Sequence, residues 1–303
     1  MIKSFLKILY VIQLAFIMNL MKLYQSILIL YKMIYNLIHI TRFDFEEVQN
    51  NVLQKVRLFP SNYKFQRINK WDIKSDDADK ELVSKDYHGN TIQLFRKVSD
   101  KLFIEIQSIG EVEVIDNDGI VGEHDNFIPL EIYKNETKLT YAGNRVKKFF
   151  KKFKNEIYKN HKIDDVLLLH KLSYFVKENI KYTKEITDIN TTAEDVISLR
   201  KGVCQDHVHV FLSLARLLGF SARYVSGYLM MNNNNIQNAS HAWAEVFLNQ
   251  LGWIGLDISN FISPNDKYIR IASGFDYYDV IPISGVRSGK GDEKLSTKII
   301  IEQ

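Results

Sequence analysis

The residue of this sequence that is best suited to nucleophilic chemistry is Cys204, the only cysteine among 303 residues. It follows Gly202 and Val203 and precedes apolar residues that recur at helical spacing, namely Val208, Phe211, Leu212, Ala215 and Leu218. This pattern predicts a helix whose first turn contains the thiol. At that position the positive end of the helix dipole, together with backbone N–H groups outside the intrahelical ladder, would favour the thiolate.

A thiolate nucleophile needs a base that can carry a proton and a group that orients the base. Residues 240–247 read as a strand that contains His241, and residues 253–257 read as a second strand that ends at Asp257. If Trp243 pairs with Asp257, His241 lies one diagonal step away on the same face and within side-chain reach, if necessary with a bulge in the turn. Taken singly, a cysteine at a helix start is more often a buried hydrophobe and a strand histidine is more often structural.

A longer pattern contains these residues. Gly202-Val-Cys204-Gln-Asp206 is followed by His209, then by Ala222-Arg-Tyr-Val-Ser-Gly227-Tyr, then by His241-Ala-Trp243-Ala-Glu245-Val, and finally by Gly252-Trp253 and Asp257. In this order the pattern strongly resembles the transglutaminase-like superfamily of cysteine enzymes, and in particular its bacterial branch, which has its own N-terminal domain. The resemblance implies a papain-like core in which Cys204 is the nucleophile, His241 the general base and Asp257 the orienting carboxylate.

Two positions depart from the pattern of that branch. Tyr268 stands where the family suggests histidine, and Phe275 stands where it suggests arginine. Both departures leave the three candidate catalytic residues unchanged, but they leave the chemistry of the substrate pocket open.

The composition fits a globular protein with substantial cores, and the resemblance implies an α+β fold. A length of 303 residues suggests one large or two moderate domains, and a hydrophobic content of 46% is ample for burying them. The formal charge of +4 is small for this length and gives no strong case for nucleic acid or acidic partners. A single cysteine rules out an internal disulfide and fits a reducing compartment, so we expect a cytoplasmic protein.

The region 33–141 is predicted to form an N-terminal antiparallel β-sandwich domain, because short alternating runs are separated by turn residues. Residues 102–109 and 111–115 read as two separate strands. His39, His88 and His124 are scattered and form no catalytic set, so we expect surface or structural roles for them.

Residues 142–162 are basic and helical in period and are expected to link the domains, with Phe149, Phe150 and Phe153 packed inward. A membrane or nucleic-acid surface is the alternative partner for such a helix. The catalytic domain is expected over 163–303, where the nucleophile helix packs on an antiparallel sheet. Its residues 191–194 read as a capping box for a short helix, and the polar loop 230–239 either flanks the substrate cleft or is a surface insertion.

The apolar extension 1–32 allows three interpretations. Met33 is the true start of the chain, or the extension is a weak membrane anchor or uncleaved signal, or it is a packed helix. The second interpretation gives the alternative location, which is membrane-anchored or exported through residues 1–32.

A metal site formed by Cys204, Asp206, His207 and His209 is not expected. Positions two apart on a helix diverge, and neither a CxxC pair nor an HExxH motif accompanies them. We therefore expect no metal and no cofactor.

The predicted function is acyl transfer from an amide to the Cys204 thiol, with a protein or peptide as the substrate. The backbone N–H of Cys204 is the natural first oxyanion donor, and the sequence identifies no second one. With water as the acceptor the enzyme is a cysteine peptidase or amidase, and with a lysine amine it is a crosslinking transglutaminase. The lack of a D-x-D-x-D-G calcium loop favours the protease. The alternative from a different class is a non-catalytic protein-binding module with the same fold.

Overall fold

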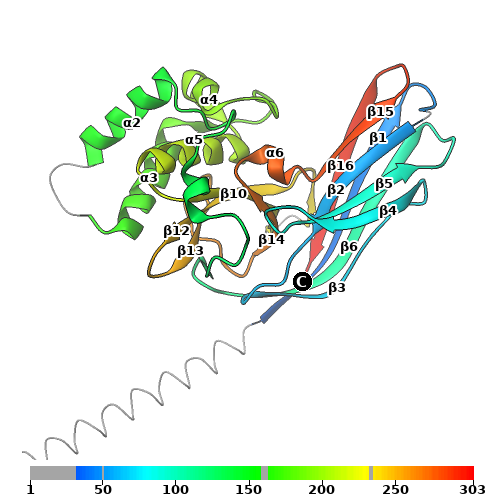
Figure 1. Ribbon diagram of the computed structural model, residues 1–303, viewed down its shortest axis with the longest axis horizontal. Helices are drawn as coiled ribbons and strands as arrows, with labels where there is room; N and C mark the ends of the chain where they lie inside the picture. The colour runs from blue at the N-terminus through cyan, green and yellow to red at the C-terminus, as the bar shows by residue number, and fades with distance from the viewer. Residues whose placement is uncertain (1–31, 50, 158–162, 232–234) are drawn as a thin grey trace, which may run out of the picture.

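The computed structural model describes residues 32–49, 51–157, 163–231 and 235–303 (Figure 1). The interpretations of residues 1–31 therefore lie outside the described residues. Within the described ranges, no helix is both long enough and apolar enough to cross a membrane. The chain folds into a helix-rich domain beside a two-sheet β domain, as an α+β protein with mostly antiparallel strands.

The β domain is the predicted antiparallel sandwich. One sheet has the strand order β11-β16-β1-β6-β3 and the other has the order β15-β2-β5-β4. Apolar side chains from the two inner faces form one core, which includes Phe43, Val56, Phe95 and Ile104. The strands are β1 (Lys32–Phe45), β2 (Asn51–Phe59), β3 (Gln66–Lys74), β4 (Ala78–Lys85), β5 (Thr91–Lys97), β6 (Phe103–Ile115), β11 (Ile236–Gln237), β15 (Ile283–Ser288) and β16 (Glu293–Glu302).

The two separate strands expected over 102–109 and 111–115 are in fact the single strand β6. Gly110 lies within this strand. The Trp71 ring of β3 occupies the space of a side chain at this position, because a Cβ there would be 2.1 Å from Trp71 Cε3. The length of β1 and β6 lets one face of this sheet serve two cores. Ile104 packs in the sandwich, whereas Leu37 and Val112 pack in the core of the helical domain.

The helical domain is built around the sheet β14-β10-β12-β13-β7, against which α5 packs. Its core joins α2, α3, α4 and α5 to that sheet. The elements are β7 (Ile120–Gly122), the 3-10 helix η1 (Leu130–Lys134), α2 (Asn144–Ile157), α3 (Asp165–Asn179), β8 (Lys181–Tyr182), α4 (Ala193–Leu199), β9 (Lys201–Gly202), α5 (Cys204–Leu217), β10 (Ala222–Leu229), β12 (His241–Leu248), β13 (Gly252–Leu256), β14 (Tyr268–Gly274) and α6 (Tyr277–Val280).

Helix α2 corresponds to the predicted linker helix. Phe153 is fully buried and Phe149 is partly buried, and both rings lie against Phe175 of α3 at centroid distances of 5.3 and 4.7 Å. Phe150 is also partly buried against this core, while the lysines of α2 face outward. The aromatic stripe is therefore covered by the protein itself.

Strand pairing differs from the expected domain boundaries at 141 and 163. The C-terminal strands return to the sandwich, where β16 pairs with β1 and β15 pairs with β2. Conversely, β7 pairs with β13 of the helical domain. The range 163–303 is thus not one structural unit, because its last two strands complete the two sheets of the sandwich, which begin with β1 at Lys32 and β2 at Asn51.

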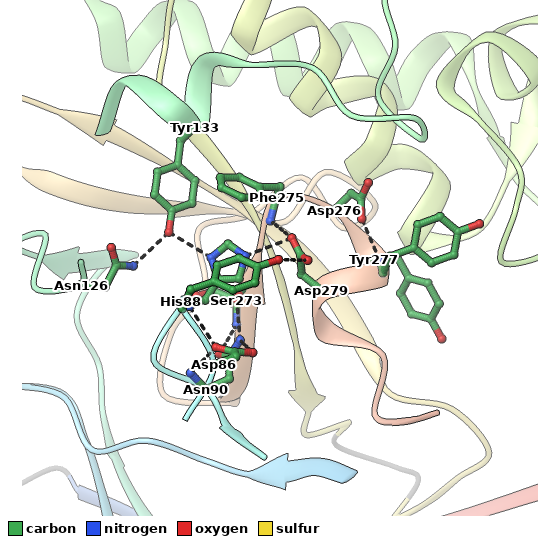
Figure 2. Close-up of polar contacts among 12 residues, drawn as sticks. Asp86, His88, Asn90, Asn126, Tyr133, Ser273, Phe275, Asp276, Tyr277 and Asp279 are labelled. Atoms are coloured by element: carbon green, nitrogen blue, oxygen red, sulfur yellow. Dashed lines mark hydrogen bonds and ion pairs between the residues drawn. The ribbon is translucent and has the colours of Figure 1, made fainter. Parts of the chain in front are cut away.

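Side chains of the sandwich bind the outer edge of β14. The Gln66 side-chain amide donates to the backbone carbonyl of Arg270 and accepts from its backbone N–H, both at 2.8 Å. The Asn90 side-chain amide makes the same pair of hydrogen bonds to the backbone of Ser273, at 2.8 and 2.9 Å. These amides satisfy backbone groups that an open sheet edge would leave unpaired. Figure 2 shows His88 beside Asn90, directed toward Tyr133 and Asp279.

His39, His88 and His124 were expected to have surface or structural roles. His39 and His88 are buried, so the surface reading is wrong for both and the structural reading holds. His39 bonds the Tyr228 hydroxyl at 2.7 Å between the two domains, and His124 bonds the carbonyl oxygen of Ile128 at 2.6 Å.

The capping box of α4 is shifted by one residue from its expected position. Thr192 is the N-cap and exchanges hydrogen bonds with Asp195. Glu194 instead accepts hydrogen bonds from the backbone of Arg145 and Val146, at 3.1 and 2.7 Å, and so caps the start of α2.

Candidate active site

Cys204 is the first residue of α5, as the sequence predicts. The preceding turn is held by the buried carboxylate of Asp206, which accepts hydrogen bonds from the Val203 backbone at 2.7 Å and the Thr187 hydroxyl at 2.6 Å. Gly202 makes room for this carboxylate, because a Cβ there would lie 2.6 Å from Asp206 Cβ. The motif Gly-Val-Cys-Gln-Asp is thus a compact turn that fixes the position of Cys204 at the start of α5.

The hairpin β12–β13 has the register that the sequence argument required. Ala244 pairs with Leu256 and Glu245 with Gly255, so continuing this register sets Asp257 opposite Trp243. His241 lies one diagonal step away, and its Nε2 donates to the Asp257 carboxylate at 2.6 Å. The register between β12 and β13 runs without a bulge from Leu248–Gly252 to Ala244–Leu256.

Asp257 is fully buried and accepts hydrogen bonds from three residues. Besides His241, Tyr268 donates its hydroxyl at 2.7 Å, and Asn260 donates its side-chain amide at 2.7 Å and its backbone N–H at 3.1 Å. Burial alone would raise the pKa of Asp257, but the hydrogen bond and charge of His241, with the bonds from Tyr268 and Asn260, lower it overall. The carboxylate is therefore held in its charged form.

His241 connects this carboxylate to the thiol. Burial alone would lower its pKa, but hydrogen bonds to Asp257 and to Cys204, with the charges of both, raise the pKa of His241 to about 10. Nε2 is bonded to Asp257, which leaves Nδ1 as the ring nitrogen available to the thiol. The imidazole is thus positioned between a buried carboxylate and the sulfur, the arrangement required of a base that activates a thiol.

A cavity of about 580 Å³ lies beside the sulfur. Tyr182, Tyr224 and Tyr277 line it near Cys204, and His241 lines it from β12. The polar segment before His241 also contributes, with Gln237, Asn238 and Ser240 in the wall. A half-open cavity with a buried ionisable pair and mixed polar and aromatic walls is typical of a substrate site.

The loop 230–239 flanks this cavity and is therefore not a bare surface insertion. Its strand β11 pairs with β16 of the sandwich, and the Gln237 side chain donates to the Leu229 carbonyl at 2.8 Å. The sandwich thereby supports one wall of the cavity, although residues 232–234 lie outside the described part of the chain.

The neighbouring histidines of α5 have structural partners. Both ring nitrogens of His207 bond backbone carbonyls, those of Val203 at 2.8 Å and Ile180 at 2.9 Å. His209 is buried and receives the Tyr277 backbone N–H at 3.4 Å, and burial, with the charge of Arg216, lowers its pKa to about 3. The Asp206 carboxylate accepts hydrogen bonds from Val203 and Thr187 in the turn before α5. The side chains of Asp206, His207 and His209 therefore do not converge with Cys204 on one point.

Three contributors to the site were not identified as such from the sequence. Tyr268 was noted only as a departure, and its position is explained here because the phenol supplies a hydrogen bond to Asp257. Asn260 returns to Asp257 because the loop closes through a bridge between Asp257 and Ile262. Thr187 binds Asp206 from a distant loop, a contact for which no local pattern exists.

Family profiles match two regions of the chain. Residues 151–258 match the transglutaminase-like superfamily, and residues 35–113 match the bacterial transglutaminase-like N-terminal region. The chain thus contains a transglutaminase-like core and the bacterial type of N-terminal region.

Individual proteins are also similar to the chain. An uncharacterised protein of Mycobacterium leprae is 25% identical over 265 residues, which are 84% of this chain and 86% of that protein. An uncharacterised protein of Mycobacterium tuberculosis is 34% identical over 131 residues, which are 40% of this chain and 42% of that protein. A crystal structure described as a candidate cysteine protease from Cytophaga hutchinsonii superposes with a TM-score of 0.70 at 18% identity, over 90% of this chain and 91% of that chain. At this identity the superposition shows a shared fold.

Proposed function

We propose that this protein is a thiol enzyme that cleaves amide bonds through an acyl-thioester, with Cys204 as nucleophile, His241 as general acid and base, and Asp257 as the group that orients His241. The observation that best supports the proposal is the 2.6 Å bond between His241 and the buried Asp257 beside the cysteine of the cavity. Burying a charged carboxylate costs free energy even when three residues donate hydrogen bonds to it, and apolar side chains could fill the same space without this cost. Such a group is therefore more typical of a functional site than of a core.

In the first half-reaction the Cys204 thiolate attacks the amide carbonyl carbon. The backbone N–H of Cys204, at the start of α5, stabilises the oxyanion that forms. The imidazolium of His241 then gives its proton to the leaving nitrogen, the C–N bond breaks, and the thioester remains.

In the second half-reaction His241 takes a proton from the acceptor, which attacks the thioester carbon and restores the thiolate. Water as acceptor releases a carboxylic acid, which makes the protein a peptidase or amidase. The structural similarity to a chain described as a candidate cysteine protease leads us to prefer water.

The test is incubation of the full chain with a glutamine-containing peptide, with and without a primary amine, followed by mass spectrometry. We expect hydrolysis of a backbone or side-chain amide in both reactions. Incorporation of the amine would identify a transglutaminase instead. No product from any peptide in a diverse library, and no difference between the wild-type protein and Cys204→Ser, would favour a non-catalytic binding module.

A further inference from the structure

A second cavity of about 580 Å³ lies between the sandwich and the helical domain. The loop that contains Lys64, the hairpin that contains Lys85 and His88, and the segment 121–127 form its walls. Its floor includes Arg223 of β10 and Arg270 of β14. It shares no lining residue with the cavity beside Cys204, and its volume is within the range of small-molecule sites.

The floor of this cavity has an excess of positive charge. Arg223 and Arg270 both bond the same carboxylate, that of Glu245, at 2.6 and 2.9 Å, and the Glu245 side chain is fully buried. Two guanidinium groups therefore share one carboxylate. Burial and the neighbouring Arg270 lower the pKa of Arg223 in spite of Glu245, whose own pKa is lowered by the two arginines against the effect of burial.

The charges at the mouth do not remove this excess. Lys64 and Lys85 are exposed there, and Glu123 and Asp125 are the acidic residues of the lining. These two cations and two anions balance each other in number. Asp125 also acts on the floor, because its charge, after the larger effect of Glu245, helps to raise the pKa of Arg270 against the effect of burial. The excess positive charge consequently lies at the floor, where burial makes its field strongest.

The walls are fixed before any ligand arrives. The Arg223 guanidinium lies 3.9 Å from the ring centroid of Trp253, and the backbone of Arg270 is bonded to Gln66. On the opposite side His88 is held by Tyr133 and Asp279, and Asn90 is held by Ser273 (Figure 2). Binding would therefore require little ordering of the protein.

We propose that this interdomain cavity is a binding site for a small anion whose carboxylate or phosphate group meets Arg223 and Arg270. Planar guanidinium groups match both kinds of oxyanion. The ligand completes the charge balance of the floor, and its remaining part lies between the two domains. The site is distinct from the candidate active site and does not depend on the proposed reaction.

Calorimetric titration of the full chain with sodium phosphate and, separately, sodium citrate at constant ionic strength tests this proposal. We expect saturable binding of at least one anion with a dissociation constant of about 1 mM or below. Binding of phosphate alone identifies a phosphate-bearing ligand, and binding of citrate alone identifies a carboxylate. Prior alkylation of Cys204 should leave the affinity unchanged.

Three variants make the titration specific to the cavity. Arg270→Gln should weaken binding about tenfold or more, because a charge-assisted hydrogen bond is lost. The double variant Lys64→Gln, Lys85→Gln alters only exposed side chains and should weaken binding several-fold, so it decides the question if Arg270→Gln does not fold. Lys70→Gln removes an exposed charge that does not line the cavity and should bind as the wild type does.

Two results would overturn the proposal. One is the lack of saturable binding by either anion up to about 10 mM, a concentration at which even a weak specific site would fill. The other is binding that the cavity variants leave unchanged or that alkylation of Cys204 abolishes.

Discussion

The Asp257 carboxylate is the most constrained group of the candidate active site at the scale of single residues. His241 and Tyr268 each bond its Oδ2 atom, at 2.6 and 2.7 Å, and Asn260 bonds both oxygens. Hydrogen bonds to a charged acceptor in a buried site are stronger than neutral ones. Each donor therefore restricts the direction in which Asp257 can hold the imidazole.

Replacing Tyr268 with phenylalanine should weaken this restriction without changing the three residues of the proposed mechanism. Loss of one hydrogen bond to a carboxylate, about 1.5–3 kcal/mol, should lower the rate of peptide cleavage by about tenfold or more. The pKa of Asp257 should rise, so the acidic limb of the pH–rate profile should move to higher pH.

Tyr278→Phe is the matched control for this substitution, because it removes a hydroxyl that bonds Asn190. Its cleavage rate and pH profile should match those of the wild type. A Tyr268→Phe protein with an unchanged rate and an unchanged profile would show that the phenol has no role in positioning Asp257.

The His241–Asp257 pair also predicts how stability depends on pH. The pKa of His241 is raised from 6.5 to about 10 in the folded protein, so its contribution is fully present below pH 6.5 and is lost as the pH rises through about 10. The pKa of Asp257 is lowered from 3.8, so its contribution is present above pH 3.8 and is lost as the pH falls through the lowered value.

Both contributions are fully present between pH 3.8 and pH 6.5. We therefore expect the difference in free energy of unfolding between the wild type and His241→Phe to be largest in this pH range. Urea unfolding of both proteins across the pH range measures this difference. A difference that grows between pH 6.5 and 10 would contradict the raised pKa of His241.

The placement of Cys204 at a helix start and of His241 beside Asp257 could be predicted from the sequence, because each residue belongs to a local pattern and the hairpin register follows from strand geometry. Asn260 could not be found in the same way. Its contact with Asp257 depends on a loop that folds back through an isolated bridge to Ile262, which no periodicity encodes.

At the scale of secondary-structure elements, the turn before α5 determines where the thiol is placed. Asp206 bonds the backbone of Val203 and the hydroxyl of Thr187, and Gly202 leaves the space that this carboxylate occupies. The turn thereby joins the start of α5 to the loop before α4.

Asp206→Ala should destabilise the protein by about 1–2 kcal/mol, the usual cost of losing a helix cap. It should also slow alkylation of Cys204 by iodoacetamide in the folded protein, because the sulfur is no longer held in one position. Stability is measured by urea unfolding, and alkylation by intact-protein mass spectrometry.

Asp195→Ala is the control for that experiment, since it removes the corresponding carboxylate from the capping box of α4. We expect a similar loss of stability and an unchanged alkylation rate. Equal slowing in both variants would mean that Asp206 acts only through global stability.

Errors in the expected elements have local causes. The strand β6 was expected as two strands, whereas Gly110 continues the strand and makes a close contact with Trp71. The capping box of α4 was misplaced because Glu194 fits the sequence pattern, but it binds Arg145 and Val146 of another helix.

At the scale of the whole molecule, the C-terminal strands tie the two domains together. Ile299 and Ile301 of β16 are fully buried in the core of the helical domain, although β16 belongs to the sandwich sheet. The same strand pairs with β11, which lies in a wall of the candidate active-site cavity. Sequence order alone could not predict this arrangement, because pairing of β16 with β1 joins the two ends of the described chain.

Ile301→Ala should therefore destabilise both domains together. The expected loss is about 2–5 kcal/mol, typical of a large-to-small change in a core. Leu295→Ala on the same strand is the control, because Leu295 is 57% exposed and its truncation should change stability little.

Native-state hydrogen exchange provides the measurement for this pair of variants. Protection should fall by the same free energy in β5 of the sandwich and in α5 of the helical domain. A loss of protection confined to the sandwich would show that the two domains unfold independently.

The most direct test of the central claim is the pH dependence of Cys204 alkylation in the wild type and in His241→Ala. Because the pKa of His241 is about 10, its ring should stay charged throughout the neutral range and favour attack by the sulfur. We expect the wild type to react at least about tenfold faster than His241→Ala near pH 6, with a smaller ratio near pH 10. Equal rates in the two proteins near pH 6 would contradict the account, because His241 would then have no influence on the sulfur.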